Sequence, residues 1–136
     1  MKAVVDTNVV ISGVFFGGNP GRVLEAWRDG LIELVVSAEV LDEYRRVGER
    51  LENQFPGVSL APFLALALAN ATIVESEPLP SPVSRDPEDD PFIACALAGG
   101  CGVIVSGDRQ LLEVSGCWGI YVPTPRQFLD RITGEP

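Results

Sequence analysis

Three short apolar runs, each ending in a polar residue, constrain the fold of this chain most strongly. They are KAVVD at 2–6, LIELVVS at 31–37 and GVIVSGD at 102–108. Apolar runs of this length are typical of strands in a parallel sheet that is buried on both faces. Segments with the apolar spacing of helices lie between them. Strands that alternate with helices predict an α/β fold, in which helices cover both faces of a parallel sheet.

The other elements follow from apolar spacing and from residues that favour helix ends. Ser37 and Thr124 are each expected to cap a helix. We expect helices over 21–30, 38–51, 60–70, 91–98, 109–114 and 125–132, and further strands over 71–75 and 118–122. The proline-rich segment 76–91 is expected to be a loop, and it is long enough to suggest a function. Residues 1–136 contain no repeat or linker and are expected to form one domain.

The composition excludes several kinds of function. The chain has no histidine, so histidine-containing catalytic triads, imidazole acid–base pairs and the usual zinc sites are excluded. No apolar run is long enough to span a bilayer, and the N-terminus lacks a convincing signal-peptide cleavage pattern. We therefore expect a cytoplasmic protein that does not bind a membrane.

Acidic residues fall where strands and a helix reach one edge of the predicted sheet. Asp6 ends the first strand and Asp108 follows a later one. The carboxyl ends of parallel strands form the edge where open α/β sheets bind ligands. The helix over 91–98 runs antiparallel to the next strand, so its N-terminus reaches the same edge. Asp90 immediately precedes that helix and is expected to lie near Asp6 and Asp108.

The helix over 38–51 supplies a fourth acid. Its apolar stripe is centred between Val40 and Tyr44. With a rotation of 100° per residue about the helix axis, the Glu43 side chain lies about 80° from that centre. The other acids of this segment lie further from the stripe (Glu39, Asp42, Glu49 and Glu52). Glu43 is thus the acid nearest the buried face, in the turns closest to the sheet edge.

Each of these acids also has a simpler interpretation. Asp6 and Asp90 are suited to capping the helices that follow them. Asp108 could be a turn or cap residue. Glu43 alone could be a solvated acid at the edge of a helix, since charged residues are mostly exposed.

The conjunction of the four acids favours a cation site. Carboxylates on one edge would repel each other and raise each other's pKa unless a cation lay among them. Oxygen ligands without imidazole or thiolate favour Mg²⁺ or Mn²⁺ over zinc. Such ions keep several waters, which suits hydrolysis at phosphorus. The formal net charge of −9 disfavours a polyanionic partner, but bound divalent cations weaken that objection because they change the local charge.

Four blocks of the sequence resemble the PIN-domain ribonucleases, which include the VapC-like toxin components of toxin–antitoxin pairs. The blocks are VVDTNVVISG, VVSAEVLDEYRRV, RDPEDDPFIACALAGG and VIVSGDRQLLEV, and TPRQFL resembles the family's closing segment. The resemblance runs in the family's order over about residues 2–129. It implies a three-layer α/β/α sandwich around a mostly parallel sheet.

The resemblance also implies an activity and a site. The expected activity is metal-dependent hydrolysis of single-stranded RNA with one or two Mg²⁺ or Mn²⁺ ions. The family's acids fall on Asp6, Glu43, Asp90 and Asp108. Asp90 is preferred to Asp89 because the family's third acid stands three residues before an apolar pair, here Ile93 and Ala94. Asp89 is then expected in a supporting role.

Polar helpers and arginines complete the expected site. Asn8 and Ser106 match the family's helper positions, with serine in place of the usual threonine at the second. Arg85 and Arg109 are expected to contact the RNA backbone. The family further suggests a small antitoxin partner and a homodimer. A DNA or structure-specific nuclease with the same acids, and a non-catalytic module with a structural metal, remain as alternatives.

Overall fold

The runs at 2–6 and 31–37 form the two central strands of a parallel sheet in the computed structural model, which describes residues 1–133. The sheet has the order β3–β2–β1–β4, with all pairs parallel. The strands are β1 (Lys2–Val5), β2 (Glu33–Val36), β3 (Thr72–Ile73) and β4 (Ile104–Val105). In β1 and β2 all residues but the first are buried, as expected for strands covered on both faces.

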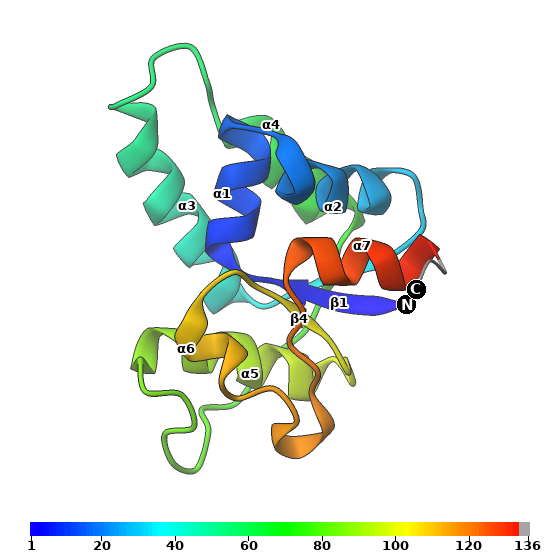
Figure 1. The fold of residues 1–136 in the computed structure, drawn as a ribbon. Helices are drawn as coiled ribbons and strands as arrows, with labels where there is room; N and C mark the ends of the chain where they lie inside the picture. The colour runs from blue at the N-terminus through cyan, green and yellow to red at the C-terminus, as the bar shows by residue number, and fades with distance from the viewer. Residues whose placement is uncertain (134–136) are drawn as a thin grey trace.

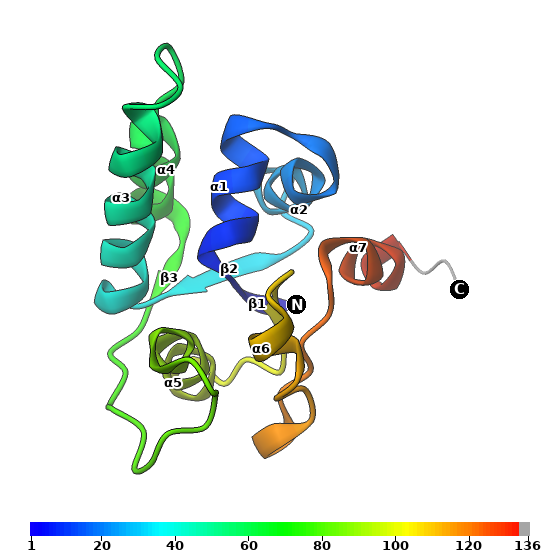
Figure 2. The same cartoon turned by 60° about the vertical axis from the view of Figure 1, so that its left-hand side comes forward.

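Helices cover both faces of this sheet. They are α1 (Thr7–Phe15), α2 (Gly18–Arg28), α3 (Ala38–Glu52), α4 (Ala61–Asn70), α5 (Asp90–Ala98), α6 (Arg109–Leu112) and α7 (Pro125–Thr133), with 3₁₀ turns η1 (Pro87–Asp89) and η2 (Cys117–Gly119). In Figures 1 and 2, α5 and α6 lie on one side of the sheet and α1, α2 and α4 on the other. The predicted three-layer α/β/α architecture is confirmed. Of the predicted domain 1–136, residues 134–136 lie outside the described part.

Two predicted helix caps are present. The Ser37 hydroxyl accepts a hydrogen bond from the amide of Val40 at 3.2 Å, at the start of α3. At the start of α7, the Thr124 hydroxyl accepts from the Gln127 amide and the Gln127 side chain accepts from the Thr124 amide. This reciprocal arrangement is a capping box. No helix within residues 1–133 has both the length and the apolar character needed to cross a bilayer.

The predicted strand at 118–122 is wrong. Trp118 lies in η2 with a φ of 54°, and the one bridge of this region pairs Tyr121 with Val103. The tight turn is closed by a hydrogen bond of 2.7 Å from the Gly116 amide to the Ile120 carbonyl. The segment after the turn runs beside β4, and the Pro123 carbonyl accepts a hydrogen bond from the Ser106 amide. Pro123 has no amide hydrogen to donate in return, so the pairing does not extend into a strand.

Tyr44 fixes α3 against the sheet. Its side chain is fully buried, and its ring packs against Phe63 of α4 and Phe92 of α5 at centroid distances of 6.0 and 6.5 Å. Its hydroxyl donates a hydrogen bond to the carbonyl of Val5, the last residue of β1. The aromatic contacts and this hydrogen bond set the height of α3 relative to the carboxyl end of β1.

Close packing of α3 against the start of α4 depends on Gly48. A Cβ at this position would lie 2.5 Å from Cδ2 and 3.0 Å from Cβ of Leu60, which is itself buried. Both distances are shorter than van der Waals contact, so an added methyl group requires Leu60 or the α4 backbone to move.

We expect Gly48→Ala to lower the free energy of unfolding by about 1 kcal/mol, because overpacking outweighs the better helix propensity of alanine. Gly102→Ala is the matched control, because a Cβ there meets no atom within 4 Å. Urea unfolding followed by circular dichroism measures the change in the free energy of unfolding of both variants. The change is read from the urea concentration at the midpoint, provided that the dependence of the free energy on urea is unchanged. A Gly48→Ala variant as stable as Gly102→Ala would contradict this account of the packing.

Candidate active site

A line of hydrogen bonds joins the carboxyl ends of β1 and β4. Asp6 directly follows β1, and its side chain is almost fully buried. Its Oδ2 accepts a hydrogen bond of 2.9 Å from the Ser106 hydroxyl, which in turn accepts from the Asp108 amide at 2.9 Å. Asp108 caps α6, because its Oδ1 accepts from the Gln110 amide at 2.8 Å. The sheet edge therefore brings Asp6 and Asp108 together, as the sequence predicts.

Glu43 reaches the same edge from α3. Its carboxylate accepts a hydrogen bond from the hydroxyl of Thr7, the first residue of α1. Asp42, the preceding residue of the helix, faces solvent and forms ion pairs with Arg45 and Arg46. Helical spacing therefore places Glu43 in the site and its neighbour Asp42 on the surface.

Asp89 is the third acid at this edge. It is 6% exposed, and its Oδ2 accepts a hydrogen bond of 3.3 Å from the Ser84 hydroxyl. After burial, the negative charges of Asp108 and Asp6 have the largest effect on its pKa. Asp89 therefore lies near those two carboxylates.

The predicted placement of Asp90 at the edge is wrong. Its carboxylate accepts hydrogen bonds from the amides of Ser84 at 2.9 Å and Val83 at 3.3 Å. The reason is that η1 continues directly into α5, so Asp89 occupies the cap position and Asp90 is already helical. One residue of helix is a rotation of about 100°, which directs the two side chains differently. Metal binding by either residue stays a prediction, but the geometry favours Asp89.

Burial and mutual repulsion raise the pKa values of the clustered acids. Burial raises the pKa of Asp6 to about 6, with further increases from Asp108 and Glu43 and a partly opposing hydrogen bond from Ser106. Burial and the neighbouring acids raise the pKa of Asp89 to about 7. Burial also raises the pKa of Glu43. Within residues 1–133, no ion pair includes any of these three acids or Asp108.

This donor set fits Mg²⁺ or Mn²⁺. The groups are carboxylates and hydroxyls without imidazole or thiolate, and within residues 1–133 none of the carboxylates forms an ion pair. In the described part of the chain, no three acidic or thiol side chains already stand at coordination distance from one point. Each carboxylate instead accepts a hydrogen bond from a hydroxyl or a main-chain amide. Ion binding therefore requires some movement of these side chains.

The predicted supporting residues have different surroundings. Ser106 is buried and bonded to Asp6, as described above. Asn8 is exposed in the first turn of α1, and Arg109 is exposed at the start of α6. Arg85 is also exposed, but its guanidinium makes several hydrogen bonds to the Glu113 carboxylate. Arg85 must leave Glu113 before it can contact a substrate phosphate.

Two hydroxyl groups of the site were missed at the sequence level. Thr7 orients Glu43, and Ser84 binds Asp89. Thr7 directly follows Asp6 in the DTN triplet, so its place at the sheet edge could have been predicted. Ser84 lies in the proline-rich segment, where no periodic pattern shows which side chains turn inward.

The α/β/α fold and its edge of four carboxylates are typical of a metal-dependent nuclease. A family model described as "PIN domain" matches residues 2–110. The chain therefore belongs to the PIN-domain family, whose members are typically nucleases that generally use divalent metals. The resemblance described above is thus confirmed at the level of the family, and the VapC-like subtype stays a prediction.

Comparison with solved structures supports the fold. Six chains of known structure match this one. Among them is the crystal structure of PAE2754 from Pyrobaculum aerophilum, with a TM-score of 0.61 and 16% sequence identity, covering 99% of this chain and 100% of that chain. At this identity the likeness concerns the fold alone. The curated proteins contain no match to the chain.

Without metal, Asp6→Asn is expected to stabilise the protein. The raised pKa of Asp6 means that the folded state binds a proton more tightly than the unfolded state. This contribution to stability is complete below about pH 4 and is lost as the pH rises through about 6. We therefore expect Asp6→Asn to gain about 1–2 kcal/mol at neutral pH in EDTA and nothing at about pH 4.

Chemical denaturation across this pH range measures the difference. Asp42→Asn is the control, because its exposed carboxylate has a pKa lowered by Arg45 and Arg46. Removing that acid is expected to leave stability at neutral pH unchanged or slightly reduced. Equal effects of the two substitutions at neutral pH would argue against buried repulsion at Asp6.

Proposed function

We propose that this protein is a metal-dependent endoribonuclease that hydrolyses phosphodiester bonds of single-stranded RNA. The observation that carries the proposal is the meeting of four acids from separate segments at one sheet edge, where none of them forms an ion pair within residues 1–133. They are Asp6, Glu43, Asp89 and Asp108. Membership of a nuclease family supports phosphodiester hydrolysis, and the four sequence blocks described above support RNA as the substrate.

Each acid has a defined part in this proposal. Asp6, Asp89 and Asp108 would hold one or two Mg²⁺ or Mn²⁺ ions, directly or through water. The bound ion supplies a polarised water and stabilises the leaving oxygen. Glu43 accepts a hydrogen bond from Thr7 at Oε2, which leaves Oε1 to take the proton of the attacking water. Its raised pKa suits that role, because a proton acceptor works best with a pKa near the working pH.

Other groups orient the acids and the substrate. The Ser106 hydroxyl fixes the Asp6 carboxylate through Oδ2. Arg109 is exposed beside Asp108 at the start of α6 and could bind a substrate phosphate, with Arg85 after its release from Glu113. Asn8 lies exposed in the first turn after Asp6, where an amide could bind the scissile phosphate or a metal-bound water.

The biological setting proposed for this activity is that of a toxin component. A small antitoxin protein would be its partner, the active form would be a homodimer, and both would act in the cytoplasm. The sequence blocks shared with VapC-like proteins support this setting. A neighbouring reading frame that encodes a small DNA-binding protein would add independent support.

Cleavage assays with substituted acids test the activity and the choice between adjacent aspartates. On a panel of single-stranded RNAs with Mn²⁺, we expect Asp6→Asn and Asp89→Asn to lose activity by about a hundredfold or more. Asp90→Asn is expected to retain activity within about threefold. The reason is that an asparagine oxygen can still accept a hydrogen bond from the Ser84 amide.

The same variants separate the alternatives. Loss of activity in Asp90→Asn with retention in Asp89→Asn would reverse our assignment of the third acid. Equal cleavage by wild type and Asp6→Asn would reject the site. Cleavage only of DNA or of structured substrates would favour a DNA or structure-specific nuclease with the same acids. Metal binding without cleavage would favour a non-catalytic module with a structural metal.

Metal binding itself is measured by thermal unfolding. An ion that binds only the folded state stabilises it by about 2.7 kcal/mol at a hundredfold excess over Kd. We expect Mn²⁺ to raise the melting temperature of wild type and Asp90→Asn, and to have much less effect on Asp89→Asn. The shift is expected to grow from about pH 5.5 to pH 7.5, because Asp6 and Asp89 must lose protons before they bind an ion. An unchanged melting temperature in the wild type would contradict a carboxylate metal site.

A further inference from the structure

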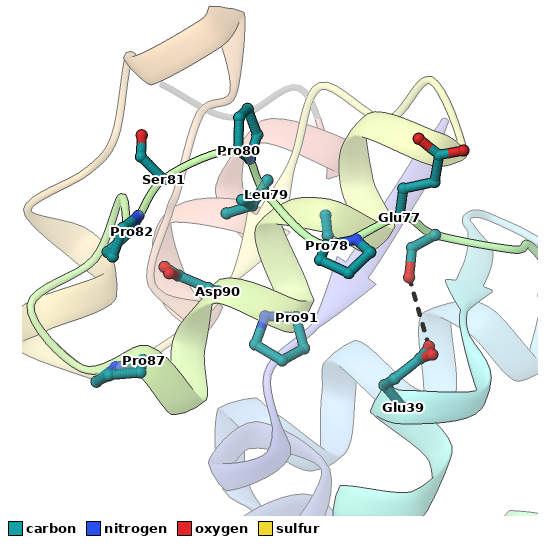
Figure 3. Close-up of a pocket in the computed structure, with 12 residues that line it drawn as sticks. Glu39, Glu77, Pro78, Leu79, Pro80, Ser81, Pro82, Pro87, Asp90 and Pro91 are labelled. Carbon is teal, nitrogen blue, oxygen red and sulfur yellow. Dashed lines mark hydrogen bonds between the residues drawn. The ribbon is translucent and has the colours of Figure 1, made fainter.

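A groove lies between α5 and the proline-rich segment that follows β3. One hollow in it has a volume of about 400 Å³ and lies near the N-terminal end of α5, beside Glu39 and Asp90 (Figure 3). A second, of about 540 Å³, reaches the C-terminal end of α5 at Leu97 and extends to Trp118. Both hollows are lined by Glu77, Pro78, Leu79, Pro80 and Ala94. Because they share this wall, we refer to the two hollows together as the groove.

Two large apolar side chains are exposed at one end of this groove. Trp118 is 53% exposed and Leu97 is 41% exposed. Trp118 also has a φ of 54°, which is unfavourable for a bulky residue. The turn that holds it is closed by main-chain hydrogen bonds from Gly116 to Ile120 and from Ile120 to Cys117. An indole presented in this way is suited to anchoring a partner, because tryptophan is enriched among the residues that dominate binding energy.

The charge of the groove decides which class of partner it fits. Four carboxylates line it, and no lysine or arginine does. They are Glu39, Glu75, Glu77 and Asp90, and within residues 1–133 none of them forms an ion pair. An RNA backbone would be repelled here, whereas lysine or arginine side chains would be attracted. A second copy of this chain, with a net charge of −9, offers few such cations.

The wall of the groove is rich in proline, which restricts its backbone. Pro78, Pro80 and Pro82 alternate with other residues along it, and each fixes its own φ. Among the described residues, the one hydrogen bond made by 75–82 joins the Ser76 hydroxyl to Glu39 at 3.4 Å. A wall that is already restricted loses little conformational entropy when a ligand binds.

We propose that this groove binds an extended segment of a partner protein in which an apolar side chain lies between lysine or arginine residues. The apolar side chain packs against Trp118 and Leu97, and the cations face Glu75 and Glu77. The interaction is separate from the proposed cleavage site, whose third acid, Asp89, does not line the groove.

A fluorescein-labelled peptide of alternating lysine and leucine tests this proposal by fluorescence anisotropy with the full chain. We expect saturable binding that weakens about tenfold or more in Trp118→Gly and about threefold or more in Glu75→Gln/Glu77→Gln. Glycine removes the indole and accepts the positive φ, so Trp118→Gly is expected to fold at least as stably as wild type. The control Glu25→Gln/Asp130→Asn removes the same charge from exposed positions outside the groove and is expected to bind like wild type.

Two further probes complete the test. An alternating glutamate–leucine peptide is expected not to bind, and the lysine peptide is expected to bind more weakly in high salt. Binding that is unchanged in both groove variants would overturn the proposal. The proposal would also be overturned if Trp118→Gly weakened binding of a uridine decamer but not of the peptide. A Trp118→Gly variant that no longer dimerised in sedimentation experiments, but still bound the peptide normally, would overturn it as well. Because the peptide assay needs neither metal nor cleavage, its failure is distinct from failure of the nuclease assay.

Discussion

The hydrogen bond from the Ser106 hydroxyl to Asp6 links the carboxyl ends of two neighbouring parallel strands. On the other flank of β1, the hydroxyl of Tyr44 binds the carbonyl of Val5, the residue just before Asp6. The end of β1 is therefore held from both sides by side chains that come from distant parts of the sequence. The other acids reach this point through helices that pack on the same sheet, so their spacing depends on a framework that is fixed before any ligand arrives.

Much of this framework could be predicted from local sequence patterns. Apolar runs located the central strands, and helical periodicity placed Glu43 on the face that meets the sheet edge. The failures occurred where one residue changes the outcome. Two consecutive aspartates before a proline fit a helix that starts at either of them, and only the continuity of η1 with α5 decides between Asp89 and Asp90. Similarly, the apolar residues after Trp118 fit a strand, but a turn at Gly119 and the missing amide hydrogen of Pro123 leave a single bridge at Tyr121.

Stability and the proposed chemistry make opposite demands on this edge. Acids that are buried without positive partners destabilise the folded protein near neutral pH, and the aromatic packing around Tyr44 and the close α3–α4 contact at Gly48 must offset that cost. The exposed acids of α3 show the contrast, because Asp42 and Glu49 are paired with arginines. Asp42 and Glu49 on the exposed side of α3 are thus paired with arginines, whereas the acids at the sheet edge form no ion pair within residues 1–133.

At this edge, protons would compete with the proposed metal ions for the same oxygens. With pKa values raised to about 6 and about 7, Asp6 and Asp89 are partly protonated near neutral pH, so the metal-free folded protein is less negative than its formal charge of −9. An ion that binds there must release those protons to the buffer. Heat measured on metal binding would therefore include the ionisation of the buffer. If the proposed ions bind here, the pH and not the ion concentration alone would set the fraction of protein that carries an ion.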